Sequence, residues 1–155
     1  MTPSSQDPSP PPSLLYIVKQ LELATRAHLD ALLRPSGITA LQYTALTVLA
    51  RRPAMSSADL ARASFVSAQS TADLVGALER HGLIDREVDP DSRRRMIIRL
   101  TDRGRAFLAE CDPLVEELEG RMLRELDRGQ RDALRSYLNS CRRSLSSVEP
   151  AERPA

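Results

Sequence analysis

The chain has 155 residues, of which 41% are hydrophobic, and its 22 basic and 21 acidic side chains give a formal net charge of +1. This length can bury the core of one domain of ordinary size. No apolar run is long enough to span a bilayer, and the first residues lack the basic flank and apolar block of a secretory signal, so we expect a cytoplasmic protein.

The charges are distributed unevenly along the chain. Residues 91–99 carry four arginines and one aspartate, whereas residues 109–128 carry seven acidic and three basic side chains. This pattern predicts one basic face on a body that is otherwise neutral or acidic.

The two ends of the chain lack the pattern of a folded segment. Residues 1–13 are rich in proline and serine, which is typical of a disordered tail, and we expect residues 147–155 to be frayed. Between them we expect a single domain over residues 14–146.

The first folded segments have the spacing of helices. Residues 14–33 place apolar side chains three and four positions apart, and Pro35 with Gly37 ends the pattern. The following segment, "ITALQYTALTVLARRP", has Thr39 as a candidate N-cap and ends at Pro53.

Two shorter helices are expected next. In "SSADLARA", Ser56 precedes Asp59 by three residues and predicts a capping box. After a break at "SFV", the segment "SAQSTADLVGALERHG" has Ser67 as its cap and Gly82 where a helix favours a left-handed residue. Such a pair is typical of a helix-turn-helix, although any small helical domain can contain one.

A hairpin follows the helix pair. Residues 83–88 and 95–101 have the alternating or β-branched pattern of strands, and "DPDSRR" between them has the composition of a turn. Helix, helix, strand, turn and strand in this order predict a winged helix-turn-helix, with a DNA-binding lobe over about residues 39–101.

The remaining residues return to helical spacing. Thr101 is a candidate cap for a helix in which Pro113 and Gly120 predict a kink, and a last helix is expected in "GQRDALRSYLNSCRRSL". The helices in residues 14–33 and 102–146 have apolar faces without a partner in so small a lobe, which favours a dimer. The predicted fold is mainly α with a small β-hairpin: a winged helix-turn-helix with N- and C-terminal dimerisation helices.

The sequence offers little foundation for catalysis or metal binding. It has no glycine-rich phosphate loop, no His-Glu-x-x-His and no Cys-x-x-Cys. His28 and His81 lie in helical patterns without a neighbouring nucleophile, and the two cysteines, Cys111 and Cys141, are far apart. We therefore expect neither an enzyme nor a cofactor or metal site.

Two groups of residues are candidates for contact with double-stranded DNA. In a helix-turn-helix the first turn of the second helix enters the major groove, and here it consists of small or amide side chains: Ser67, Ala68, Gln69, Ser70 and Thr71. Arginines at the hairpin turn can reach phosphates or a narrow minor groove, and here they are Arg93, Arg94 and Arg95. The alternatives are a capped helix with neutral surface residues and a solvated loop.

Two aspartates are expected to support the hairpin. Asp91 can pair with Arg93 or Arg94, and Asp89 can cap the turn.

The segments "LQYTALTVLA", "SSADLARA" and "SAQSTADLVGALERHGLIDREVDPDSRRRMIIRLTDRGRAFL" resemble the MarR family of bacterial transcriptional regulators, and the resemblance covers roughly residues 14–146. It implies a homodimer held together by the first and the last two helices, a recognition helix at 67–81 and a wing at 89–95. Within the wing, Asp91 and Arg93 match the family's acidic and basic pair. Ser92 departs from the acidic residue common in the family, and Phe65 stands where glycine is usual.

The resemblance also implies a possible effector, since family members often bind a small aromatic or anionic ligand between the dimer arm and the DNA-binding lobe. The candidate lining residues are Tyr16, Arg26 and Tyr43, with simple packing as the alternative for both tyrosines. Other members sense oxidants through a cysteine of the first helix, which this chain lacks. Cys111 and Cys141 fall on apolar faces instead.

The resulting hypothesis is a dimeric repressor that binds a pseudo-palindromic site near its own gene and is released by a small ligand. The alternatives are a redox-sensing regulator that acts through Cys111 or Cys141, and a ligand-binding protein without DNA activity.

Overall fold

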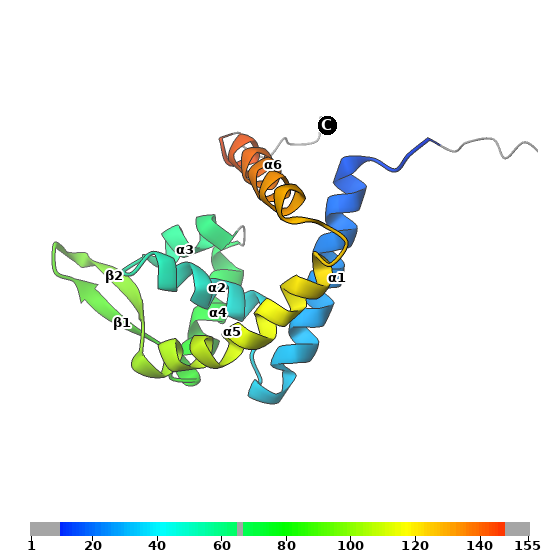
Figure 1. The fold of residues 1–155 in the computed structure, drawn as a ribbon. Coiled ribbons are helices and arrows are strands. Elements are labelled where there is room, and N and C mark those ends of the chain that lie inside the picture. The colour runs from blue at the N-terminus through cyan, green and yellow to red at the C-terminus, as the bar shows by residue number, and fades with distance from the viewer. Residues whose placement is uncertain (1–9, 65–66, 148–155) are drawn as a thin grey trace, which may run out of the picture. The chain divides into compact units, whose positions relative to one another are not determined.

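The computed structural model describes residues 10–64 and 67–147. In chain order the elements are α1 (Leu14–Leu33), the 3-10 helix η1 (Arg34–Ser36), α2 (Ala40–Arg51), α3 (Ser57–Ser64), α4 (Ala68–Arg80), β1 (Ile84–Asp89), β2 (Ser92–Leu100), α5 (Asp102–Met122) and α6 (Arg128–Ser146), shown in Figure 1. The prediction of a mainly helical fold with one antiparallel hairpin is confirmed.

The chain divides within α5 into two compact units, the first ending at Leu114 and the second beginning at Val115. The prediction of one domain over residues 14–146 stays a prediction, as do the tails, of which residues 1–9 and 148–155 lie outside the described residues. Among the described helices, none is long and apolar enough to cross a membrane.

The helix starts follow the predicted caps. The Thr39 hydroxyl accepts from the backbone N–H of Gln42, and the Gln42 side-chain carbonyl accepts from the backbone N–H of Thr39. These two bonds form a capping box at α2. Ser67 caps α4 by accepting from the N–H of Ser70 at 3.2 Å. Each bond satisfies a backbone donor that the helix leaves free at its first turn.

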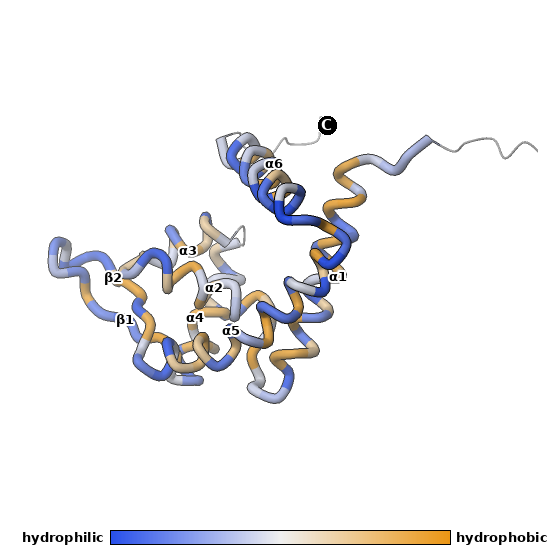
Figure 2. Tube along the Cα trace, in the orientation of Figure 1, coloured by the Kyte–Doolittle hydropathy of each residue, from blue (hydrophilic) through white to orange (hydrophobic). Residues whose placement is uncertain are grey.

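One hydrophobic core holds the helix-turn-helix and the base of the hairpin together. Helix α3 contacts α2 and α4, and α2 also contacts β2. Hydrophobic stretches of the tube in Figure 2 lie in these elements, and also in α1 and α5. The largest fully buried apolar side chains of this unit are Leu33, Leu46, Leu49, Leu60, Val75, Leu78 and Ile98.

The hairpin has a longer second strand and a shorter turn than predicted. The ladder runs from Ile84 opposite Leu100 to Val88 opposite Met96, and then jumps to Asp89 opposite Ser92. Three residues of β2 therefore stand between two neighbouring residues of β1, which is an enlarged bulge. The predicted start of the second strand at residue 95 is wrong, because β2 begins at Ser92 and only Pro90 and Asp91 form the turn. The three arginines are the extra residues of the bulge.

The start of α5 is packed against the loop that precedes β1. The Thr101 hydroxyl donates to the carbonyl of Gly82 at 2.6 Å and accepts from the N–H of Gly104 at 3.0 Å. A Cβ atom on Gly104 would lie 2.1 Å from the carbonyl oxygen of Leu83, so only glycine fits there. Gly82 is left-handed, with φ of 69°, as the sequence predicts.

The Gly104→Ala substitution is expected to lower the free energy of unfolding by about 1–3 kcal/mol, because backbone has to move to admit the methyl group. The matched control is Gly120→Ala in the same helix, where a Cβ atom would meet nothing within 4 Å. That change is expected to raise stability by up to about 1 kcal/mol through helix propensity. Urea unfolding at one fixed protein concentration measures both, and equal effects would contradict the close packing at Gly104.

Candidate nucleic-acid interface

The first turn of α4 presents four short or amide side chains to solvent. Ser67, Ala68, Gln69 and Ser70 are exposed, in a row that begins at the helix cap. The hydroxyls of Ser67 and Ser70 lie 3.0 Å apart and hydrogen-bond to each other. The turn therefore offers hydroxyl and amide groups on a surface that another molecule can approach closely.

Thr71 does not belong to this surface, which corrects the prediction. It is 1% exposed, and its hydroxyl donates to the carbonyl of Ser67 at 2.9 Å. Four residues after the cap, it lies on the inner face of the helix, one turn below Ser67. Thr71 therefore holds the helix start to the core. The prediction about Phe65, in the loop before α4, lies outside the described residues.

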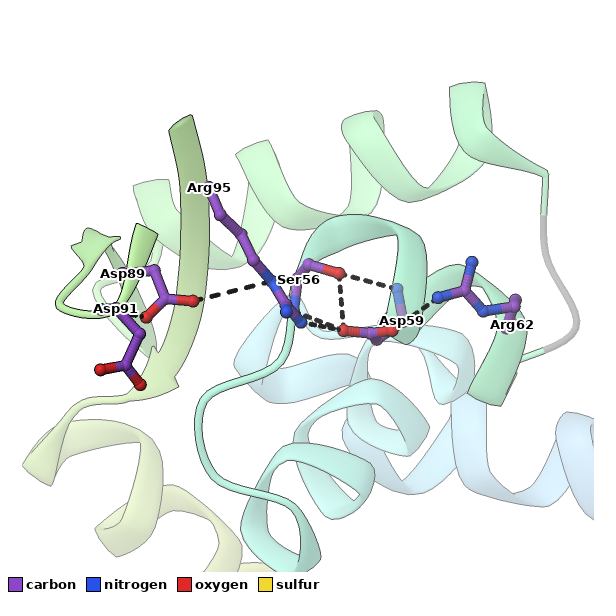
Figure 3. A network of polar contacts seen from close by, with 6 residues as sticks. All are labelled: Ser56, Asp59, Arg62, Asp89, Asp91 and Arg95. Carbon is purple, nitrogen blue, oxygen red and sulfur yellow. Dashed lines mark hydrogen bonds and ion pairs between the residues drawn. The ribbon is translucent and has the colours of Figure 1, made fainter. Parts of the chain in front are cut away.

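The three arginines of the bulge have different surroundings. Arg93 and Arg94 are exposed, and neither side chain has a hydrogen bond or ion pair within the described part of the chain. Arg95 instead donates through Nη2 to Asp59 Oδ2 at 2.6 Å, and its Nε lies 3.9 Å from Asp89 Oδ2 (Figure 3). Two of the three arginines are therefore exposed and unpaired among the described residues, and contact of the arginines with DNA stays a prediction.

The two wing aspartates also differ from each other. Asp89 accepts from the N–H of Asp91 at 2.9 Å and so caps the turn, as predicted. The predicted pairing of Asp91 with Arg93 or Arg94 is not made in the described structure. The Asp91 carboxylate is directed away from Arg95 in Figure 3, and it is Asp89 that faces this arginine.

Asp59 is the centre of the polar network in Figure 3. It accepts from the N–H and the hydroxyl of Ser56 at 3.2 and 2.7 Å, which confirms the capping box, and from Arg62 Nη2 at 2.5 Å. These bonds, first those from Ser56 and then those from Arg62 with the charge of Arg95, lower the pKa of Asp59 to about 2. The carboxylate is thus ionised under ordinary conditions.

The bond between Asp59 and Arg95 joins residues 36 positions apart, and no sequence motif indicates it. The capping motif identifies Asp59 only through neighbours in its own helix. A second tie of this kind joins α4 to β1, where Arg86 Nη2 donates to Glu79 Oε2 at 2.6 Å, and this bond lowers the pKa of Glu79. Arg99 and Glu87 form a further ion pair across the hairpin.

The three candidate ligand residues do not gather at one place. Tyr16 is exposed near the start of α1, and Arg26, about 15 Å further along that helix, pairs with Glu22. Tyr43 is 7% exposed, and burial together with the nearby Asp112 and Cys111 raises its pKa. The burial of Tyr43 agrees with the alternative of simple packing, and a ligand site at these residues stays a prediction.

The two cysteines also have different surroundings. Cys111 is buried, and its burial, with Glu110 and Asp112 beside it, raises the pKa of its thiol. A raised pKa lowers the thiolate fraction that oxidants attack, which argues against Cys111 as a sensor. Cys141 is exposed. No three His, Cys, Asp or Glu side chains of the described segments are grouped to hold a metal ion.

Comparison with known proteins identifies relatives of this arrangement. Residues 36–95, which contain the helix-turn-helix and most of the hairpin, match the MarR family. The HTH-type transcriptional repressor Rv2887 of Mycobacterium tuberculosis is 29% identical over 123 residues, which are 79% of this chain and 88% of that protein.

Two solved structures share the fold. The S. aureus MepR–DNA complex has a TM-score of 0.74 at 23% identity and covers 86% of this chain and 96% of its own. Bordetella bronchiseptica BpsR, whose DNA binding is regulated by 6-hydroxynicotinic acid, has a TM-score of 0.73 at 23% identity and covers 83% of this chain and 97% of its own.

The low pKa of Asp59 predicts how stability depends on pH. In the unfolded chain this carboxyl protonates near its ordinary pKa of 3.8, whereas in the folded protein it stays charged down to about pH 2. Its contribution is therefore complete above about pH 4 and is lost as the pH falls toward 2. Asp59→Asn is expected to be less stable than the parent at pH 7, with a difference that shrinks between pH 4 and pH 2.

Urea midpoints of both proteins, measured from pH 7 to pH 3, test this expectation. The control is Asp85→Asn, which removes an exposed carboxylate of β1 that forms no ion pair among the described residues. A gap between Asp59→Asn and the parent that is constant from pH 7 to pH 3 would contradict the assignment.

Proposed function

Because the chain belongs to the MarR family, we propose that it is a cytoplasmic, dimeric transcriptional regulator that binds a specific DNA sequence and acts as a repressor. The observation that carries the proposal is a single compact unit that presents both an exposed polar helix start and two arginines without an ion pair to any described residue. The first is the start of α4, and the second is the bulge of β2. Relatives named as repressors, Rv2887 among them, support the direction of regulation.

The start of α4 would supply the base contacts. Gln69 can form two hydrogen bonds with the edge of adenine, Ser67 and Ser70 can bond to base edges or phosphates, and Ala68 can contact the methyl group of thymine. Because all four side chains are short or of moderate length, the helix backbone can lie close to the floor of the major groove. Buried Thr71 would keep the helix start from moving away from the core.

Arg93 and Arg94 would supply the sequence-independent contacts. Each is exposed, carries a full charge and lacks an acidic partner among the described residues. Arginines of this kind gain most from phosphates and from a narrow minor groove, where the negative potential is largest. The MepR–DNA complex, which shares the fold, supports a role in DNA binding.

The helices at the two ends would join two copies of the chain. Helix α1 exposes Leu14, Leu15, Tyr16, Ile17, Val18, Leu21 and Leu23, and α6 exposes Tyr137, Leu138 and Leu145. Apolar surface of this extent is typical of a protein interface. A dimer with two-fold symmetry would place two α4 helices on half-sites about 34–36 Å apart in a pseudo-palindromic operator.

A small aromatic or anionic effector would release the DNA. The support is the relative BpsR, whose DNA binding is regulated by 6-hydroxynicotinic acid. A ligand that binds better to an arrangement with the wrong spacing of the two α4 helices would shift the population toward it and away from DNA. Tyr16 and Arg26 are the solvent-accessible candidates for its site.

The double substitution Arg93→Ala/Arg94→Ala is expected to weaken binding to all duplexes. It should reduce the slope of log K against log salt by about 2 per subunit, since each lost phosphate contact removes about 0.9. Gln69→Ala should leave that slope unchanged and reduce discrimination at one base pair by about 1–3 kcal/mol.

Fluorescence anisotropy with an operator duplex and a scrambled duplex measures both effects, and Arg142→Ala on α6 serves as the control for loss of a positive charge. An unchanged salt slope in the double variant would contradict the wing assignment. Absence of any duplex binding by the parent protein would favour a ligand-binding protein without DNA activity.

Leu138→Glu is expected to weaken the dimer at least tenfold, because it places a charge among apolar side chains that the second copy would cover. Ser136→Glu, on the opposite side of α6, is the matched control and should leave the association unchanged. Sedimentation equilibrium measures both constants. A parent protein that sediments as a monomer at micromolar concentration would refute the dimer.

A further inference from the structure

The hairpin is attached to the start of α3 at two levels. At its base, Met55 and Ile98 exchange backbone hydrogen bonds of 3.3 and 2.7 Å, so that Met55, two residues before α3, forms an isolated antiparallel bridge with β2. Three residues closer to the tip, Arg95 reaches Asp59 within the first turn of α3 (Figure 3). The base is thus fixed by backbone and the tip by one side chain.

Arg95 differs from its two neighbours in charge as well as in contacts. Its guanidinium stands between two carboxylates, Asp59 at 2.6 Å and Asp89 at 3.9 Å. These neutralise its charge locally, so that it has little to offer a phosphate. Arg93 and Arg94 keep their full charge.

We propose that Arg95 is a positioning residue: by binding Asp59 it fixes the direction of the hairpin tip relative to α3, so that Arg93 and Arg94 meet DNA in a defined place. This inference rests on the proposed DNA-binding function and divides the roles within it. Arg95 itself makes no phosphate contact.

The anchor is suited to this role because it is itself held in place. Before Arg95 is considered, Asp59 already accepts three bonds, two from Ser56 and one from Arg62. An ion pair with a carboxylate that is already ordered costs less conformational entropy than one with a free carboxylate, because only the arginine side chain has to become ordered. A two-stranded hairpin is only marginally stable alone, so one ordered contact near its tip has a large effect on where the tip lies.

The geometry also requires arginine and not merely a positive charge. Arg95 uses Nη2 toward Asp59 and Nε toward Asp89, two nitrogens of one planar group. Lysine has a single nitrogen and cannot hold both carboxylates with that fixed geometry. Arg95→Lys should therefore restore only part of the affinity that Arg95→Gln loses.

A double-mutant cycle tests the inference, with Asp59→Asn, Arg95→Gln and the double variant titrated against one operator duplex at several salt concentrations. Each single variant is expected to bind about two- to fivefold more weakly per half-site, as the loss of an exposed ion pair predicts. The double variant should bind no more weakly than the weaker single one, and the salt slope should stay that of the parent. Removal of an acidic charge alone would tighten DNA binding, so weaker binding of Asp59→Asn has to come from the loss of one of the bonds of Asp59.

The cycle also separates this bond from the cap of α3. In the Arg95→Gln background, Asp59→Asn removes the cap, the ion pair with Arg62 and a charge, but no bond to residue 95. If it weakens binding there as much as in the parent, the effect comes from the cap or from Arg62 and the inference is wrong. Asp85→Asn, which removes a carboxylate of the same hairpin, is the control for charge and is expected to bind as the parent does or more tightly.

A measurement without DNA gives an independent outcome. Hydrogen exchange of the amides of residues 92–96 should be faster in Asp59→Asn and Arg95→Gln than in the parent and Asp85→Asn. If Arg95→Gln lowers the salt slope as Arg93→Ala does and Asp59→Asn tightens binding, Arg95 contacts phosphate and the inference fails while the proposed function stands. If Arg93→Ala/Arg94→Ala binds as the parent does, the wing assignment fails as well, and if the parent protein binds no duplex at all, the proposed function fails instead.

Discussion

The two strands of the hairpin are not stable alone, so the contacts of the hairpin with α3 determine where the arginines of the candidate interface lie. Two-stranded sheets are marginal in water, so one face has to be buried or tied down. Here Ile97 and Ile98 bury the base, and the backbone pairing of Ile98 with Met55 joins β2 to the start of α3. The segment that begins α3 and the strand that carries the arginines are therefore joined by backbone hydrogen bonds.

Charge pairing then decides which arginines are available. Arg62 and Arg95 share Asp59, Arg86 binds Glu79, and Arg99 binds Glu87. Bonds at this level of exposure contribute little to stability individually. Their larger effect is to neutralise the positive charge of the other hairpin arginines locally. The net positive potential of the hairpin is therefore concentrated at Arg93 and Arg94. A chain of net charge +1 can present a strongly positive point in this way.

The sequence predicted those features that depend on near neighbours. The caps at Thr39, Ser56 and Ser67 are defined within four residues, and all three form. The bulge was not predictable, because three consecutive arginines look the same in a turn as in a strand whose partner jumps. Thr71 was misjudged for a related reason, since its polarity suggests a surface while its hydroxyl is satisfied by a carbonyl one turn away.

The pair of Asp59 and Arg95 was not predictable either. In the sequence, Asp59 is already assigned to the capping motif of its own helix, and Arg95 is already assigned to the run of arginines at the turn. Only the fold brings them to 2.6 Å. One carboxylate then serves two elements: it begins α3 through Ser56 and holds the hairpin through Arg95. The start of α3 and the hairpin tip therefore share one carboxylate, which is bonded to Ser56 on one side and to Arg95 on the other. Within the run of three arginines, the one that is least free governs where the other two can act.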